Sequence, residues 1–192
     1  MTMLPLLLLL TPQWIELTLE RESEGAWKPA PPGLVLETGS RDRYRYQTPN
    51  TALVYVVNHG SSGARKLLFP APDSGMDNHV RQGTSYLVPS TEAAFRVSGP
   101  EGHDIVYWIL SPRALGEAEA LALAREAAPP ARLLPRCDDS VLRARGECVD
   151  TQAGPRLVSR ELTIVQKDER TRVGISTPPE RPLVYQYRIP HR

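Results

Sequence analysis

The feature that most constrains this 192-residue chain is the strict alternation of apolar and polar residues in short segments. Over residues 14–20, WIELTLE, the apolar residues Ile15, Leu17 and Leu19 occupy every second position. Successive side chains of a strand point to opposite faces, so this pattern predicts a strand with one buried face. Residues 43–47 alternate tyrosine with arginine and predict a second strand of the same kind.

Similar short segments fill most of the chain. Residues 104–110 are apolar on both faces, so this strand is expected in the middle of a sheet. Residues 53–57 and 65–69 are predicted to form a hairpin, because Asn58–Gly63 supplies two glycines that can adopt positive φ. Other strands are predicted at residues 85–88, 93–97, 160–166, 171–176 and 183–189. This spacing predicts an all-β fold, an antiparallel β-sandwich that is Ig-like or jelly-roll-like.

One α-helix is predicted around residues 112–127. Ser111 can cap it, Pro112 suits the first helical position, and Pro129-Pro130 end it. Its packed face is expected to consist of Leu115, Ala118, Leu121 and Ala122.

The length of the chain suits one domain, and we expect residues 13–192 to form a single sandwich. Within it we distinguish a first part at residues 14–112, the helix and a cysteine-containing segment at 113–156, and the C-terminal strands at 157–190.

Residues 1–12 stand apart from this domain. Leu6–Leu10 has the length of the apolar part of a signal peptide and is too short to span a membrane, and no other segment approaches transmembrane length. No Lys or Arg precedes the run and no Ala-x-Ala site follows it, so the alternatives are a first buried strand and a mis-assigned or truncated start. We expect export to the periplasm or cell surface, with the cytoplasm as the alternative.

Cys137 and Cys148 are the only cysteines. The ten residues between them fit neither a metal knuckle nor a redox C-x-x-C motif. In an oxidising compartment a disulfide between them would close a short loop and stabilise the fold by about 3 kcal/mol. We predict this disulfide together with export, and two reduced, unrelated thiols are the alternative.

The balance of charge argues against a nucleic-acid partner. The chain has 23 basic and 22 acidic residues, and they are interspersed. A nucleic-acid-binding domain typically shows a basic face. Gly60–Gly63 lacks the lysine of a P-loop and is followed by a predicted strand, so a hairpin turn is the better interpretation.

No metal or cofactor is predicted. Asp73–His79 gathers oxygen ligands, but the twelfth position of an EF-hand beginning at Asp73 would be Thr84 instead of glutamate. A turn in which Asp or Asn side chains bond the local backbone is favoured there. The four histidines show no metal-ligand spacing and are scattered at His59, His79, His103 and His191.

No catalytic residue is predicted either. Ser61 and Ser62 lie in a glycine-containing turn, but not in G-x-S-x-G. Neither Cys137 nor Cys148 has the sequence context of a catalytic nucleophile.

Aromatic residues could form a carbohydrate or peptide surface, but most fall at alternating strand positions that favour core packing. This set comprises Tyr44, Tyr46, Tyr107, Trp108, Tyr185 and Tyr187. Trp14 and Trp27 are the better candidates for exposure.

Three segments carry a recognisable pattern of motifs. They are residues 52–70, ALVYVVNHGSSGARKLLFP, residues 76–89, MDNHVRQGTSYLVP, and residues 95–112, FRVSGPEGHDIVYWILSP. In order and spacing they resemble the strand-turn-strand, Asp-Asn and Gly-Pro elements of the domain of unknown function 4384 family. The resemblance covers roughly residues 14–112, and residues 184–192 are similar to the closing segment of stand-alone bacterial members.

The chain departs from the family pattern at two places. Gly39–Arg43 contains an insertion relative to the usual Gly-Asp-Arg start of the second strand, and His103-Asp104 stands where the family has a glutamate. The resemblance implies a β-rich module, found alone in exported proteins or attached to signalling and peptidase domains, with no activity of its own.

We therefore expect a non-enzymatic binding or scaffolding module of the bacterial cell envelope, secreted or periplasmic, that recognises a protein or glycan through loops or a strand edge. One alternative is a regulatory or sensory domain acting with a separately encoded kinase or peptidase. Another is a hydrolase with a site assembled from scattered residues, which a pocket holding a serine or carboxylate beside a histidine would favour. The sequence does not constrain the oligomeric state.

Overall fold

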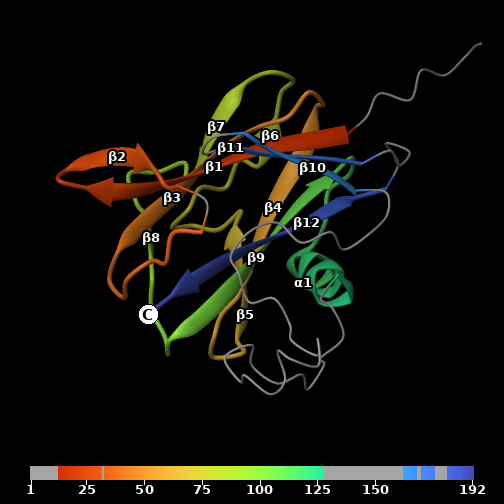
Figure 1. Cartoon of the computed structure of the whole chain (residues 1–192). Helices are drawn as coiled ribbons and strands as arrows, with labels where there is room; N and C mark the ends of the chain where they lie inside the picture. The colour runs from red at the N-terminus through yellow and green to blue at the C-terminus, as the bar shows by residue number, and fades with distance from the viewer. Residues whose placement is uncertain (1–12, 32, 128–161, 168–169, 176–180) are drawn as a thin grey trace, which may run out of the picture.

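The computed structural model describes residues 13–31, 33–127, 162–167, 170–175 and 181–192. Over these residues the chain forms two antiparallel β-sheets and one α-helix (Figure 1). The prediction of an all-β sandwich with a single helix is confirmed. No helix in this part of the chain is long and apolar enough to cross a membrane. The predicted leader, residues 1–12, and the predicted disulfide between Cys137 and Cys148 lie outside the described residues.

The first sheet has seven described strands, in the order β10-β11-β1-β3-β7, with β2 added to β1 and β8 added to β3. These strands are β1 (Gln13–Ser23), β2 (Ala26–Pro29), β3 (Arg41–Gln47), β7 (Ser85–Val88), β8 (Phe95–Arg96), β10 (Leu162–Lys167) and β11 (Arg170–Ile175). β1 is central, because it pairs with β3 along one edge and with β11 and β2 along the other. β2 occupies part of the proline-rich segment for which no strand was predicted, and it ends at Pro29.

The second sheet has five described strands, in the order β12-β9-β4-β5, with β6 added to β4. They are β4 (Ala52–His59), β5 (Arg65–Phe69), β6 (His79–Val80), β9 (Gly102–Ser111) and β12 (Leu183–His191). β4 and β5 form the predicted hairpin, and β9 lies between β12 and β4, in the interior position expected from its two apolar faces.

The core between the sheets is built from the positions that the alternation predicts. Ile15, Leu17 and Leu19 of β1 are at most 5 % exposed. Trp108 of β9 is fully buried, and its ring centroid lies 5.2 Å from that of Tyr44 and 5.3 Å from that of Tyr46, both on β3. Aromatic contacts across the core thus join the two sheets.

The helix α1 extends over Glu117–Glu126, so its predicted start at Pro112 is wrong. The Ser111 hydroxyl accepts a hydrogen bond from the backbone N–H of Arg113 at 3.2 Å and donates to the Arg113 carbonyl at 2.6 Å, which closes a local turn. Gly116 then adopts an extended conformation immediately before the helix. A side chain that hydrogen-bonds to nearby backbone groups competes with helix formation, and glycine is a poor helix former.

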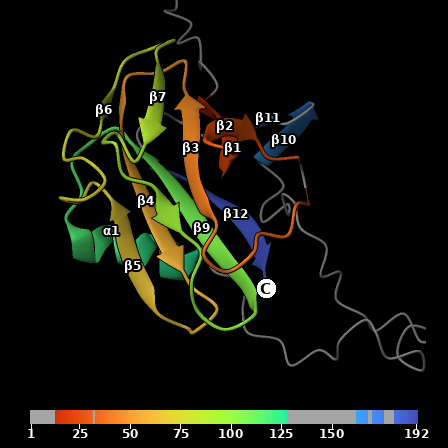
Figure 2. The same cartoon turned by 90° about the vertical axis from the view of Figure 1, so that its left-hand side faces the viewer.

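The predicted packed face of α1 is also wrong in part. Ala120 and Ala124 are fully buried, whereas Ala118 and Ala122 are exposed. Leu115, just before the helix, is buried as expected. The helix lies against β4, β5 and β9 on the outer face of the second sheet (Figures 1 and 2). It covers a second apolar cluster that includes Tyr55, Val57, Tyr107 and Ile109.

Candidate functional site

The stripe of inward-facing residues changes from apolar to polar at one end of the sandwich. Four strands each contribute one polar side chain there, and each is the next inner position beyond a buried apolar residue. They are Asp42 on β3, Asn58 on β4, Asp104 on β9 and His191 on β12. Because strand alternation fixes the face on which each side chain lies, the four converge on one pocket.

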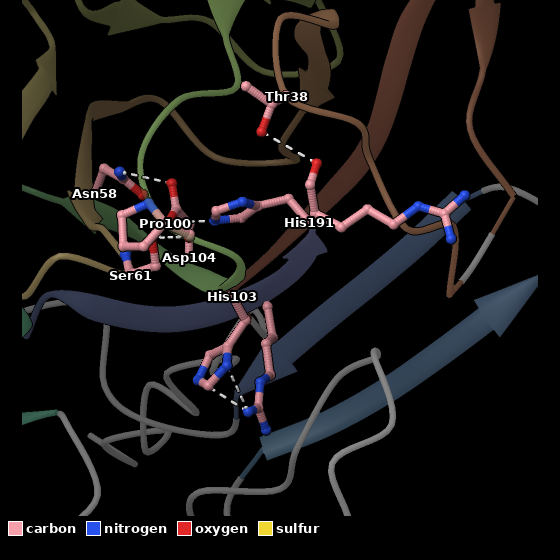
Figure 3. A network of polar contacts seen from close by, with 9 residues as sticks. Thr38, Asn58, Ser61, Pro100, His103, Asp104 and His191 are labelled. Carbon is pink, nitrogen blue, oxygen red and sulfur yellow. Dashed lines mark hydrogen bonds and ion pairs between the residues drawn. The ribbon is translucent and has the colours of Figure 1, made fainter.

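Asp104 is the centre of the polar network (Figure 3). One carboxylate oxygen accepts the backbone N–H of Ser61 at 2.8 Å, and the other accepts the Asn58 side-chain amide at 3.1 Å. The Nε2 atom of His191 lies 3.1 Å from the first of these oxygens, and the His191 side chain is only 1 % exposed. The Asp104 carboxylate is therefore well satisfied by neighbouring groups.

Two turns are held together beside Asp104. The Ser61 hydroxyl, in the β4–β5 turn, donates to the carbonyl of Pro100 in the β8–β9 turn at 2.8 Å. A Cβ atom on Gly99, which has φ of +102°, would lie 3.2 Å from that hydroxyl. Gly63 has φ of +85°, and its N–H donates to the Gly60 carbonyl at 2.8 Å, as the predicted glycine turn requires.

Backbone bonds on both sides of His191 hold it in place. The N–H of Leu36 donates to the Pro190 carbonyl at 2.9 Å, and the N–H of Arg192 donates to the Leu36 carbonyl at 3.0 Å. The C-terminal end of β12 is thus tied to the segment before β3, and Ile189 and His191 complete a pocket that is otherwise formed by residues 36–106.

Asp42 differs from Asp104, because its carboxylate has no partner. Its side chain lines the pocket and is 5 % exposed, and it makes no hydrogen bond or ion pair with any described residue. Burial, with a further contribution from the negative charge of Asp104, raises the pKa of Asp42 to about 7. The neighbouring Tyr44 hydroxyl is also buried without a hydrogen-bond partner in the described part of the chain.

The pocket has a volume of about 390 Å³. Its walls are largely apolar and include Leu36, Tyr44, Leu68, Phe95, Val106 and Ile189. Lys66 and Arg96 also line it, and both are exposed. Apolar walls that converge on a few polar groups are typical of small-ligand sites.

A carboxylate beside a histidine in a pocket is the arrangement that the hydrolase alternative requires. Asp104 and His191 provide this pair, and Ser61 is close by. However, the Ser61 hydroxyl donates to the Pro100 carbonyl, and it is the backbone N–H of Ser61 that donates to Asp104. Ser62 is exposed.

The other described histidines make no hydrogen bond to this pair. His103 neighbours it in sequence, but its ring contacts Arg188 at 2.8–2.9 Å, and burial together with the Arg188 charge lowers the pKa of His103. Burial and the Arg65 charge likewise lower the pKa of His59. Across the described ranges, no group of three or more His, Cys, Asp or Glu side chains is placed to hold a metal ion.

The Asp73–His79 loop contains the turn that was favoured over a calcium site. A carboxylate oxygen of Asp77 accepts the backbone N–H of His79 at 3.1 Å and lies 3.3 Å from its ring. An aspartate that bonds the backbone two residues further on stabilises a turn by itself. The interpretation as a turn is confirmed.

The prediction that the strand aromatics pack in the core agrees with the structure, whereas the predicted exposure of Trp14 and Trp27 does not. Five of the six strand aromatics are at most 4 % exposed and Tyr187 is half-buried. Trp14 and Trp27, expected to be exposed, are also half-buried. The Arg43 guanidinium lies 4.4 Å from the ring centroid of Trp27, so that this ring is partly covered.

A second polar cluster lies on the outer face of the first sheet, around Glu20. The Glu20 carboxylate accepts the Nε–H groups of Arg43 at 2.7 Å and of Arg45 at 2.8 Å. Burial acts to raise the pKa of Glu20, but hydrogen bonds from Arg45 and Arg43 outweigh it and lower that pKa. Arg41 is paired with Glu22 in the same way at 2.7 Å. Both carboxylates of this cluster are paired with arginines, so among these described residues no carboxylate lacks a partner as Asp42 does.

The fold and the pocket define a small antiparallel β-sandwich domain whose core ends in a cluster of polar side chains. Residues 35–114 match the family described as "Domain of unknown function (DUF4384)", in agreement with the resemblance seen in the motifs. The matched span contains Asp42, Asn58 and Asp104, whereas His191 comes from outside it. No curated protein and no solved structure matches the chain significantly.

Sequence analysis did not single out these four residues as a site. The signal that could have indicated them is a polar residue at an inner position of a strand, as at Asp42 and Asp104. That signal alone does not show which strands meet.

Proposed function

We propose that this protein is a non-catalytic binding module whose ligand occupies the polar pocket at the end of the sandwich. The observation that supports this most directly is Asp42, a buried carboxylate that faces the pocket without a partner among the described residues. An unpaired buried charge costs free energy, and proteins tolerate such a cost mainly at functional sites. A ligand that pairs with the Asp42 carboxylate would offset that free-energy cost.

The local geometry favours binding over hydrolysis. A serine hydrolase needs the hydroxyl hydrogen-bonded to the base and the base oriented by a third group. Here the Ser61 hydroxyl donates to the Pro100 carbonyl, and His191 is 3.1 Å from Asp104. A hydrolase remains the second candidate, since the Asp104–His191 pair does lie in a pocket. The hydrolase would be favoured if the wild type hydrolysed ester or peptide substrates and His191→Gln abolished that activity.

Binding in the pocket can be tested with a library of small cationic, anionic and neutral probes. We expect some probes to shift the NMR amide resonances of Ser61, Asp104 and His191. Ala64→Trp places a large ring on an exposed position that lines the pocket and should abolish these shifts. Ala26→Trp, exposed on β2, is the matched control and should leave them unchanged. Probes that shift only resonances remote from the pocket, or persistent shifts in Ala64→Trp, would count against the proposal.

We also propose that the module acts outside the cytoplasm, in the cell envelope, on a protein or glycan partner. The apolar run Leu6–Leu10 and the isolated pair Cys137 and Cys148 support export together. Fractionation of native cells should then recover the protein outside the cytoplasm, and thiol titration of the denatured, unreduced protein should find no free thiol. Recovery from the cytoplasm with two free thiols would contradict both parts.

A further inference from the structure

We propose that the pocket binds an organic cation, an alkyl ammonium or guanidinium on an apolar stem, and that Asp42 is its counter-ion. This inference rests on the proposed binding function and specifies the chemistry of the ligand.

The buried carboxylates of the pocket argue for a cation. Two carboxylates line it, and Asp104 already accepts hydrogen bonds from Asn58 and Ser61 and contacts His191. Asp42 has no such partner in the described ranges, although it is 5 % exposed. A buried carboxylate is stable in its ionised form when a positive charge lies next to it. Asp42 lacks such a neighbour among the described residues, so we expect the ligand to place one positive charge beside it.

The walls argue for a cation carried on an apolar stem instead of a bare ion. Leu36, Leu68 and Val106 present aliphatic surface, and the rings of Tyr44 and Phe95 lie 6.2 Å apart between their centroids. Methylene chains that carry a charged end group pack well on such surface, and aromatic rings attract cations. The volume of about 390 Å³ accommodates a group of the size of a lysine or arginine side chain.

Other charged and titratable groups also face Asp42. Tyr44 lies on the same strand, Asp104 and His191 project from the opposite sheet, and Lys66 and Arg96 line the pocket from exposed positions. In the described residues neither Lys66 nor Arg96 forms an ion pair, so neither occupies the place of the cation. Asp42, whose pKa is raised to about 7 by burial, would lose its proton when a cation binds.

The test is calorimetric titration of the full chain at pH 8 with pentylamine, pentylguanidine, 1-pentanol and pentanoate. We expect both cations to bind, and 1-pentanol and pentanoate to bind at least tenfold more weakly. Asp42→Asn, first shown to be folded by thermal unfolding, should weaken cation binding at least tenfold. Asp73→Asn, an exposed aspartate outside the pocket, is the matched control and should bind as the wild type does. At pH 6 the affinity of the wild type should fall about tenfold, because Asp42 is then mostly protonated.

A second experiment distinguishes a cation on the side chain of a protein partner from a free small amine. A capped peptide containing one lysine is compared with the same peptide containing norleucine. Binding of the lysine peptide supports a side chain of a protein partner, and binding of pentylamine without the peptide supports a free small amine. Equal binding of 1-pentanol, unchanged binding by Asp42→Asn, or binding of pentanoate alone would overturn the cation proposal and leave pocket binding standing. If none of the four probes binds, the cation proposal fails, and the library screen with Ala64→Trp decides the proposed function separately.

Discussion

Asp42 occupies an inner position of β3, two residues before Tyr44 and four before Tyr46. The period of two in a strand therefore directs its side chain between the sheets, where Tyr44 and Tyr46 are buried. Sequence alone predicts this orientation once the strand is recognised. It does not predict that Asp42 lacks a partner, because that depends on which residues of the opposite sheet face it.

Replacing Asp42 should reveal its cost to stability. Burial raises its pKa from 3.8 to about 7, so the folded state holds the proton at pH values where the unfolded state has lost it. Stability is therefore lost as pH rises from about 4 through 7. Asp42→Asn resembles the protonated acid and should raise the free energy of unfolding by about 2–4 kcal/mol at pH 8 and by little at pH 4. Urea denaturation at both pH values measures this, and a variant less stable than wild type at pH 8 would indicate a paired carboxylate.

The contact between Asp104 and His191 could not be predicted from the individual residues. Both residues alternate correctly within their strands, and both were noted separately in the sequence. They are 87 residues apart, and they meet because β12 pairs with β9 in a register that opposes Ile189 to Asp104. Register between strands so distant in sequence is set by the packing of the whole sheet, which one sequence does not reveal.

Among the elements, α1 is the one that sequence analysis placed least well. Alanine occupies both sides of the helix, so the apolar pattern does not select one face. Gly116 and the local bonds of Ser111 delay its start to Glu117. The strands were placed better, since alternation gives each of them a buried and an exposed face.

A pair of substitutions tests the packed face of α1. Ala120→Asp would bury an unpaired charge against the second sheet and should lower the free energy of unfolding by about 3 kcal/mol or more. Ala122→Asp, two residues further on and exposed, should change it by less than about 0.5 kcal/mol. Chemical denaturation of both variants measures the difference. If Ala122→Asp instead lowered the free energy of unfolding more than Ala120→Asp, the packed face of the helix would be the one predicted from the sequence.

At the scale of the whole molecule, the pocket joins parts of the chain that lie far apart in sequence. β3 contributes from the first sheet, and β4, β9 and β12 contribute from the second. Both views place the C-terminus beside the start of β9, so the last strand closes the polar end (Figures 1 and 2). The fold class followed from local alternation, whereas this site depends on the assembled sandwich.

The measurement that tests the central claim most directly is the pKa of Asp42 in the ligand-free protein, from a ¹³C NMR titration of side-chain carboxyl groups. Asp42→Asn assigns the resonance by removing it. A buried carboxylate without a partner should titrate near 7. A pKa at or below its ordinary value of 3.8 would show that Asp42 is solvated or already paired, and would contradict the claim that Asp42 is a buried carboxylate in need of a partner from a ligand.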